Sequence, residues 1–166
     1  MTATEIRIVW ESQRDGVRDA ARFLARVVRL DTAYISHGEI QQALSPDGIH
    51  WASDLEDRFL DAAADMDDSR SVLTARAGTT ILGAAIVHWS LDSEARFATL
   101  EDIAVEPGGR STGVGQQMFE VIEAEARRRG AHWVFLESGL HNERAHGFFE
   151  RAGFHPVSKV FSKRLG

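Results

Sequence analysis

Hydrophobic residues in the first third of the chain switch between strand-like and helix-like spacing. The run 6–10, Ile-Arg-Ile-Val-Trp, has the β-branched and aromatic composition of a strand. Residues 15–28 carry apolar side chains every three or four positions, which predicts an amphipathic helix with Asp15 as its N-cap. Residues 31–48 are polar and end in Ser-Pro-Asp-Gly, so we expect a loop. A second helix is predicted over 53–65, where a serine precedes a glutamate by three residues.

The rest of the chain shows a hairpin followed by alternating strands and helices. Two β-rich runs, 71–77 and 81–89, are joined by Gly-Thr-Thr and predict the hairpin. A third strand over 98–105 is followed by the breaker Pro-Gly-Gly. The downstream pattern predicts two more helices, 115–129 and 142–151, and two more strands, 133–136 and 157–161. This order predicts a single α/β domain with a mixed sheet over residues 1–166.

Composition limits the classes of protein to which the chain can belong. Its 166 residues, 43% of them hydrophobic, suit one globular domain with a sizeable core. No apolar run approaches the roughly 20 residues that cross a bilayer, and no signal-peptide core is present, so we expect a soluble, cytoplasmic protein with no membrane association. The absence of cysteine excludes disulfides and a cysteine nucleophile. The seven histidines lack metal-ligand spacing, so we predict no metal site.

Charge is distributed unevenly along the chain. The formal net charge of −6 argues against general nucleic-acid binding, which requires a basic surface. Residues 31–70 hold ten acids against two arginines, whereas residues 110–166 hold nine Lys or Arg against six Glu. One region would then favour a cation and the other an anion. Alternatively, both stretches are solvated helix faces, and the sequence leaves this choice open.

A glycine-rich loop, Arg110-Ser-Thr-Gly-Val-Gly115, separates the strand 98–105 from the helix that follows it. The unpaired N–H groups and the positive dipole end at a helix N-terminus attract phosphate. Gly113 and Gly115 would let the backbone approach a ligand closely, and Arg110 would add a charge-assisted contact. The loop lacks both the dinucleotide fingerprint and the Lys-Ser/Thr ending of a nucleotide P-loop. It therefore predicts a phosphate site of another kind.

The pattern R-x-x-G-x-G resembles the pyrophosphate loop of the GNAT superfamily of acyl-CoA-dependent N-acyltransferases. Residues 142–154, N-x-x-A-x-x-F-F-E-x-x-G-F, resemble the second motif of that family, N-x-x-A-x-x-F-Y-x-x-x-G-F. The matching parts cover roughly residues 71–164, and the N-terminal half fits mainly by element order. The resemblance implies an α/β (α+β) fold with a mixed, centrally splayed sheet flanked by helices. It also implies acetyl-CoA as cosubstrate.

The resemblance further implies which residues hold coenzyme A. The pantetheine arm would pair with the strand before the loop, with the acetyl carbonyl held there, along Ile103, Ala104 and Val105. A backbone N–H near Ala104 would stabilise the oxyanion. The pyrophosphate would lie on Arg110, Ser111, Thr112, Gly113, Val114, Gly115 and Gln116. Asn142 would contact the pantetheine, and Phe149 would also line the coenzyme A site.

Acetyl transfer to an amine needs a group that accepts the amine's proton. Glu101 and Asp102 lie on the strand before the loop, and because side chains alternate along a strand, we expect only one of them to face the amine. The triplet Leu-Glu-Asp resembles that of polyamine acetyltransferases, which implies Glu101 as the general base. Asp102 and Tyr34 are the candidates for substrate binding. Either carboxylate is alternatively a charge anchor for the substrate or simply solvated.

Phe149 replaces a tyrosine that, in many members of that family, protonates the departing thiolate. The proton would then come from water, from the incoming ammonium, or from a side chain such as His141 or Ser138. We expect direct acetylation of a primary amine, without an acyl-enzyme. Dimers are common in the family that the chain resembles, so the resemblance also suggests a homodimer. A small cationic amine is the first acceptor class and a protein or peptide N-terminus the second. The alternative is a module that binds acyl-CoA as a sensor without catalysis.

Overall fold

The computed structural model describes residues 4–110 and 112–166. Its contacts divide the chain into two compact units, each assembled from two segments that are distant in sequence. The first unit combines the N-terminal segment up to Leu30 with residues 54–136, and the second combines residues 31–53 with 137–166. The single domain predicted over residues 1–166 therefore stays a prediction.

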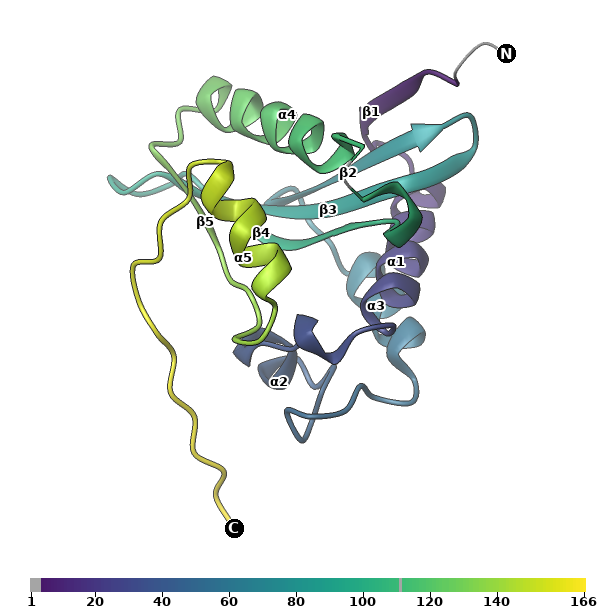
Figure 1. Cartoon of the computed structure of the whole chain (residues 1–166). Coiled ribbons are helices and arrows are strands. Elements are labelled where there is room, and N and C mark those ends of the chain that lie inside the picture. The colour runs from purple at the N-terminus through teal and green to yellow at the C-terminus, as the bar shows by residue number, and fades with distance from the viewer. Residues whose placement is uncertain (1–3, 111) are drawn as a thin grey trace. The chain divides into compact units, whose positions relative to one another are not determined.

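A five-stranded sheet forms the centre of the first unit (Figure 1). In spatial order its strands are β1 (Ile6–Trp10), β2 (Arg70–Ala77), β3 (Thr80–Ser90), β4 (Phe97–Val105) and β5 (Trp133–Leu136). The first four strands are antiparallel neighbours, whereas β5 joins β4 in parallel. The mixed sheet with flanking helices confirms the predicted fold class.

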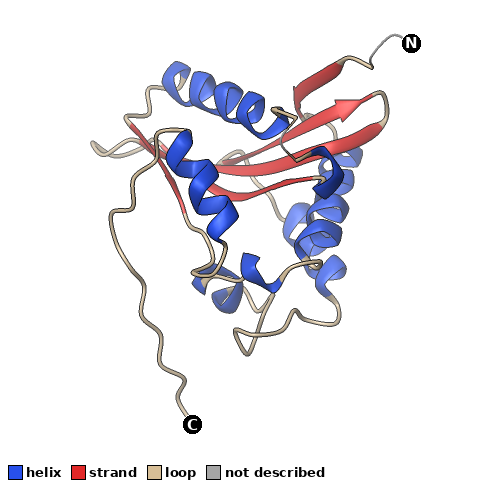
Figure 2. Cartoon of the chain, viewed as in Figure 1, coloured by secondary structure: helices blue, strands red, loops and turns tan. Residues whose placement is uncertain are grey.

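Helices cover both faces of this sheet (Figures 1 and 2). The helical elements of the first unit are α1 (Arg14–Val28), α3 (Leu55–Ala64), the short 3₁₀ helix η2 (Pro107–Gly109) and α4 (Val114–Arg128). Helix α4 packs so closely on one face that a β-carbon at Gly83 would lie 2.7 Å from the sulfur of Met118. On the other face, Arg76 forms ion pairs with Glu11 at 2.9 Å and with Asp19 of α1 at 3.8 Å. Helix α1 also packs against α3.

The hydrophobic core of the first unit lies between the sheet and these helices. Its apolar side chains come from the inner stripes of α1 and α4, as the 3.6-residue period predicts, and from both faces of the central strands. The largest fully buried apolar side chains of this unit are Leu24, Val27, Leu55, Leu73, Val87, Val114, Met118 and Ile122.

Tight backbone packing organises the second unit, which contains η1 (Thr32–Tyr34), α2 (His37–Gln41) and α5 (Glu143–Arg151). A β-carbon at Gly139 would lie 2.0 Å from the carbonyl oxygen of Ala33, so only glycine allows these two segments to approach. His37 and Glu137 are paired at 3.2 Å across the same junction.

Two predictions about this part of the chain are wrong. Residues 157–161 do not form a strand; they lie in an irregular segment that exposes Phe161 to 90% (Figure 2). Residues 31–48 are not simply a loop, because η1 and α2 lie there, and Ser36 begins α2 with a capping box closed by Glu39. Strand-like composition does not make a strand without a hydrogen-bonding neighbour, and a one-turn helix shows no apolar period.

The remaining differences concern helix starts. Helix α1 begins at Arg14 with Gln13 as its N-cap, two residues before the predicted cap at Asp15. Helix α3 begins at Leu55 with Asp54 as its N-cap, so the predicted cap at Ser53 is one residue too early. Both shifts are of the size by which helix ends usually vary.

Candidate functional site

A bulge interrupts β4 at Glu101. Asp102 lies opposite Ile86 of β3, whereas the next residue of β3, Val87, lies opposite Leu100. Glu101 is therefore the extra residue of β4, without a cross-strand partner in this register. Such bulges redirect side chains and are common next to active sites.

The bulge brings two carboxylates to the same face of the sheet. Glu101 binds Arg70, which lies opposite His88, and Asp102 lies opposite Ile86, two residues from His88 on the same strand. Residues in register, and residues two apart on a strand, share a face. The expectation that Glu101 and Asp102 face opposite sides is therefore wrong, because the bulge breaks the alternation. Both lie on the face that α1 covers.

Arg70 holds both oxygens of Glu101. Its Nε donates to one oxygen at 2.9 Å and its Nη2 to the other at 3.0 Å, a bidentate geometry that fixes the carboxylate plane. The hydrogen bond with Glu101 raises the pKa of Arg70 above its usual value. An amine that uses Glu101 must therefore share this carboxylate with Arg70. The role of Glu101 as general base stays a prediction.

The sheet opens beside the second half of β4. Pairing between β4 and β5 runs from Phe97 to Leu100, and β5 ends at Leu136 while β4 continues to Val105. Within the described residues of the first unit, no strand lies along that edge of Ile103, Ala104 and Val105. Because β5 is the last strand of the sheet, this opening lies at the edge of the sheet, whereas the predicted splay was central. An open edge offers backbone donors and acceptors to an extended ligand.

The open edge leads into the glycine-rich loop and α4. Gly113 is the N-cap of α4 with φ of 87°, a left-handed conformation that favours glycine. Because glycine has no side chain to cap the helix, the first N–H groups of α4 depend on other partners, such as an anion. Val114 is buried and anchors the helix, whereas Gly115 is half-buried and Thr112 and Gln116 are exposed. Ser111 lies outside the described residues.

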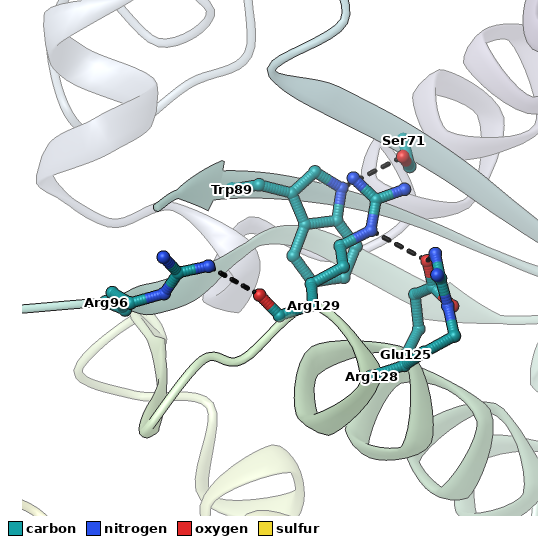
Figure 3. A network of polar contacts seen from close by, with 6 residues as sticks. All are labelled: Ser71, Trp89, Arg96, Glu125, Arg128 and Arg129. Carbon is teal, nitrogen blue, oxygen red and sulfur yellow. Dashed lines mark hydrogen bonds and ion pairs between the residues drawn. The ribbon is translucent and has the colours of Figure 1, made fainter. Parts of the chain in front are cut away.

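The far end of α4 is fastened to the sheet by a polar network (Figure 3). The guanidinium of Arg129 lies 4.4 Å from the ring centroid of Trp89, whose indole N–H donates to Ser71. Glu125 accepts hydrogen bonds from Arg128 and Arg129, and these arginines, Arg128 first, lower the pKa of Glu125 to about 2. The network therefore holds the C-terminal end of α4 in place, and α4 is the helix whose N-terminus follows the glycine-rich loop.

The other candidate residues belong to the second unit. The side-chain oxygen of Asn142 accepts from the N–H of Ala145 at 3.4 Å and caps α5. Phe149 is buried, with its ring centroid 6.2 Å from that of Phe154. Tyr34 is half-buried in η1, in the segment against which Gly139 packs. His141 is exposed. Ligand contacts of these residues stay predictions.

The acidic stretch is less uniform than its charge implies. It divides between the two units at residue 54. Six of its ten acids have partners in caps, turns or ion pairs: Asp31, Glu39, Asp47, Asp54, Glu56 and Asp67. The stretch as a whole therefore does not define a cation site, and the carboxylates at the bulge become the better candidate.

Arg70 is the candidate residue that the sequence analysis missed. It lies in the acidic stretch, 31 positions before Glu101, and only the register of β2, β3 and β4 brings the two together. A bidentate partner of a carboxylate is typically arginine, but nothing in the local sequence indicates which arginine.

Within residues 4–110 and 112–166, no helix has both the length and the apolar character to cross a membrane. No group of three or more His, Asp or Glu side chains there is arranged to hold a metal ion.

Comparison with known proteins identifies the family of the chain. The acetyltransferase (GNAT) family model matches residues 37–154, and the chain belongs to this family. The IAA acetyltransferase of Azospirillum brasilense is 30% identical over 95 residues, which are 54% of this chain and 60% of that protein. The streptothricin acetyltransferase of Streptomyces lavendulae is 34% identical over 87 residues, 52% of this chain and 45% of that protein. The chain thus spans about half the length of these relatives.

Solved structures share the fold at low sequence identity. An aminoglycoside N-acetyltransferase in complex with CoA aligns with a TM-score of 0.70 at 16% identity, over 98% of this chain and 96% of that one. An acetyltransferase structure from Pyrococcus furiosus aligns with a TM-score of 0.66 at 20% identity, over 97% and 100% of the two chains. These similarities support the fold assignment.

Proposed function

We propose that the chain transfers an acetyl group from acetyl-CoA to a primary amine. The observation that carries this proposal is the continuity of two binding features along β4: the edge that opens after Leu100, and the glycine-capped start of α4 a few residues later. An extended amide chain with a pyrophosphate fits this order, because the edge suits the amides and the helix N-terminus suits the phosphates. Membership of the acetyltransferase (GNAT) family supports the acetyl group.

The end of β4 and the loop that follows it have proposed roles in binding acetyl-CoA. Ile103, Ala104 and Val105 offer their backbone groups to the pantetheine arm and the acetyl carbonyl. Residues 110–116, including Ser111 outside the described residues, surround the pyrophosphate. When bound, acetyl-CoA supplies a thioester carbonyl that a neutral amine can attack. A sheltered backbone N–H near Ala104 would stabilise negative charge on that carbonyl oxygen.

The proposed roles of the two carboxylates at the bulge are to accept the proton of the amine and to bind the positive charge of the acceptor. Glu101 takes the proton, directly or through a water molecule, and Arg70 keeps its carboxylate in a fixed plane while it does so. Asp102, on the same face, holds the positive charge of the acceptor. The departing thiolate takes a proton from solvent, because Phe149 has no phenol to donate one. A thiolate is a tolerable leaving group near neutral pH.

A small cationic amine is the proposed acceptor. Two carboxylates, Glu101 and Asp102, share one face of β4, and Arg70 binds the first of them. A pair of carboxylates on one face favours a cationic substrate. A structural neighbour whose name describes an aminoglycoside N-acetyltransferase supports small-molecule amines. A protein or peptide N-terminus is the second acceptor class.

The test is thiol release by the purified chain with acetyl-CoA and a panel of acceptors. The panel contains a polyamine, an aminoglycoside, a basic amino acid and a short peptide with a free N-terminus. Amine-dependent thiol release, with an acetylated product of matching mass, supports the proposal. CoA binding without thiol release from any acceptor would refute it and favour a sensor that binds acyl-CoA, the function that Phe149 keeps open.

A further inference from the structure

Glu106, an acidic residue, lies four residues before the loop that is predicted to bind the pyrophosphate. Glu106 connects the end of β4 to the loop, and its backbone is fixed on both sides. Its N–H donates to the carbonyl of Leu82 at 2.7 Å, and its carbonyl accepts from the N–H of Gly109 at 2.8 Å. A carboxylate fixed here would repel an anion bound at the start of α4.

Arg26 of α1 pairs with this carboxylate. Its two terminal nitrogens lie 2.5 Å and 3.3 Å from the two oxygens of Glu106, so the ion pair is bidentate. The guanidinium also lies 5.3 Å from the ring centroid of Phe23, which limits its movement. The two partners are 80 residues apart in sequence, so their ion pair links α1 to the segment that leads into the glycine-rich loop.

Arg110 links the ion pair to the predicted ligand. Glu106 and Arg110 are the residues at the two ends of the short helix η2, and the N–H of Arg110 donates to the carbonyl of Pro107 at 3.4 Å, so the two residues are held close together. In keeping with this, hydrogen bonding from Arg26 lowers the pKa of Glu106, and the charge of Arg110 lowers it further. Arg110 is also the cation that the loop is predicted to offer to the pyrophosphate. Glu106 and the ligand therefore compete for the charge of Arg110, and Arg26 offsets this competition.

We propose that Arg26 is a positioning residue for the coenzyme A site: it neutralises Glu106 and so leaves the phosphate loop attractive to an anion. This inference rests on the proposed function, because the anion is the pyrophosphate of CoA. The side chains of Arg26 and Glu106 are 54% and 32% exposed, so their ion pair contributes little to folding. Its effect should appear in ligand affinity instead.

The experiment measures CoA affinity by titration calorimetry in four chains. Arg26→Met keeps the apolar stem and removes the charge; the dissociation constant for CoA should rise about three- to tenfold, and less at high salt. Arg26→Met combined with Glu106→Gln should return to within about twofold of the wild type, because no bare carboxylate remains. The matched control is Arg22→Met, one turn earlier on α1, which removes the same charge from a pair with Glu56 at 3.7 Å. It should bind CoA as the wild type does.

Kinetics separate positioning from a general structural defect. Arg26→Met should raise KM for acetyl-CoA by the same factor and leave kcat and the melting temperature nearly unchanged. Unchanged CoA affinity in Arg26→Met, or no recovery in the double variant, would overturn this inference alone. A wild-type chain that binds no CoA would overturn the proposed function and this inference with it.

Discussion

Replacing Gly113 tests whether the loop conformation creates the phosphate site. Gly113 has φ of 87° and ψ of 0° at the N-cap of α4. Among the described residues, an added β-carbon would meet nothing closer than a side-chain nitrogen of Gln117 at 4.0 Å. Steric collision is therefore not the issue, and the cost of Gly113→Ala is conformational. An alanine in the left-handed region costs about 1–2 kcal/mol.

This cost can appear in either of two measurements. If the unliganded loop relaxes and must be restored on binding, the cost reduces CoA affinity by about five- to thirtyfold, since about 1.4 kcal/mol corresponds to a factor of ten. If the loop keeps its conformation in both states, the same cost lowers the free energy of unfolding. Titration calorimetry with CoA and chemical denaturation of the unliganded chain together account for the whole cost.

Gly108→Ala is the matched control for Gly113→Ala. Gly108 lies in η2, five residues before Gly113, has no positive φ, and would place its β-carbon within 4 Å of no described residue. It should leave both affinity and stability close to those of the wild type. Gly113→Asn should behave better than Gly113→Ala, because asparagine tolerates the left-handed region. If Gly113→Ala binds CoA and unfolds as the wild type does, the conformational argument for the phosphate loop is wrong.

Three further predictions concern other parts of the molecule. Glu101→Gln should lower kcat by roughly 10²-fold or more and change CoA affinity little, because a general base acts on the amine; wild-type turnover of this variant across about pH 6 to 9 would contradict the assignment. Glu125→Gln should unfold more easily at neutral pH by about 1–2 kcal/mol. Because the folded pKa of Glu125 is lowered from 4.5 to about 2, its stabilisation is present above pH 4.5 and disappears as pH falls to about 2, so the deficit of the variant should shrink in that window; a constant deficit in acid denaturation curves would refute this. Gly139→Ala should lower the free energy of unfolding by about 2 kcal/mol or more, since its β-carbon would collide with the carbonyl of Ala33, and an unchanged melting curve would contradict that packing.

The elements of the first unit were largely predictable from the sequence because their hydrophobic periods are local. The helix α4 and the strand Trp133–Leu136 lie within one residue of their predicted bounds. The loop between β4 and α4 was predictable for a related reason: a position with a positive φ favours glycine, and glycine can be recognised in the sequence.

Features that depend on pairing between distant segments were not predictable in the same way. The bulge at Glu101 is a property of the register between β3 and β4, and a rule of strict alternation gave the wrong face for one carboxylate. Arg70 and Arg26 find their partners only through the folded sheet and the packing of α1. The run 157–161 has strand-like composition but no strand in the structure, because pairing and not composition makes a strand.

A crystal structure of the chain with CoA and a polyamine bound would test the proposed site directly. We expect the pantetheine arm along the open edge of residues 103–105, the pyrophosphate at the N-terminus of α4 beside Gly113, and an amine nitrogen within hydrogen-bond reach of Glu101 or Asp102. A CoA molecule bound away from the β4 edge, or an amine held away from both carboxylates, would contradict the proposal.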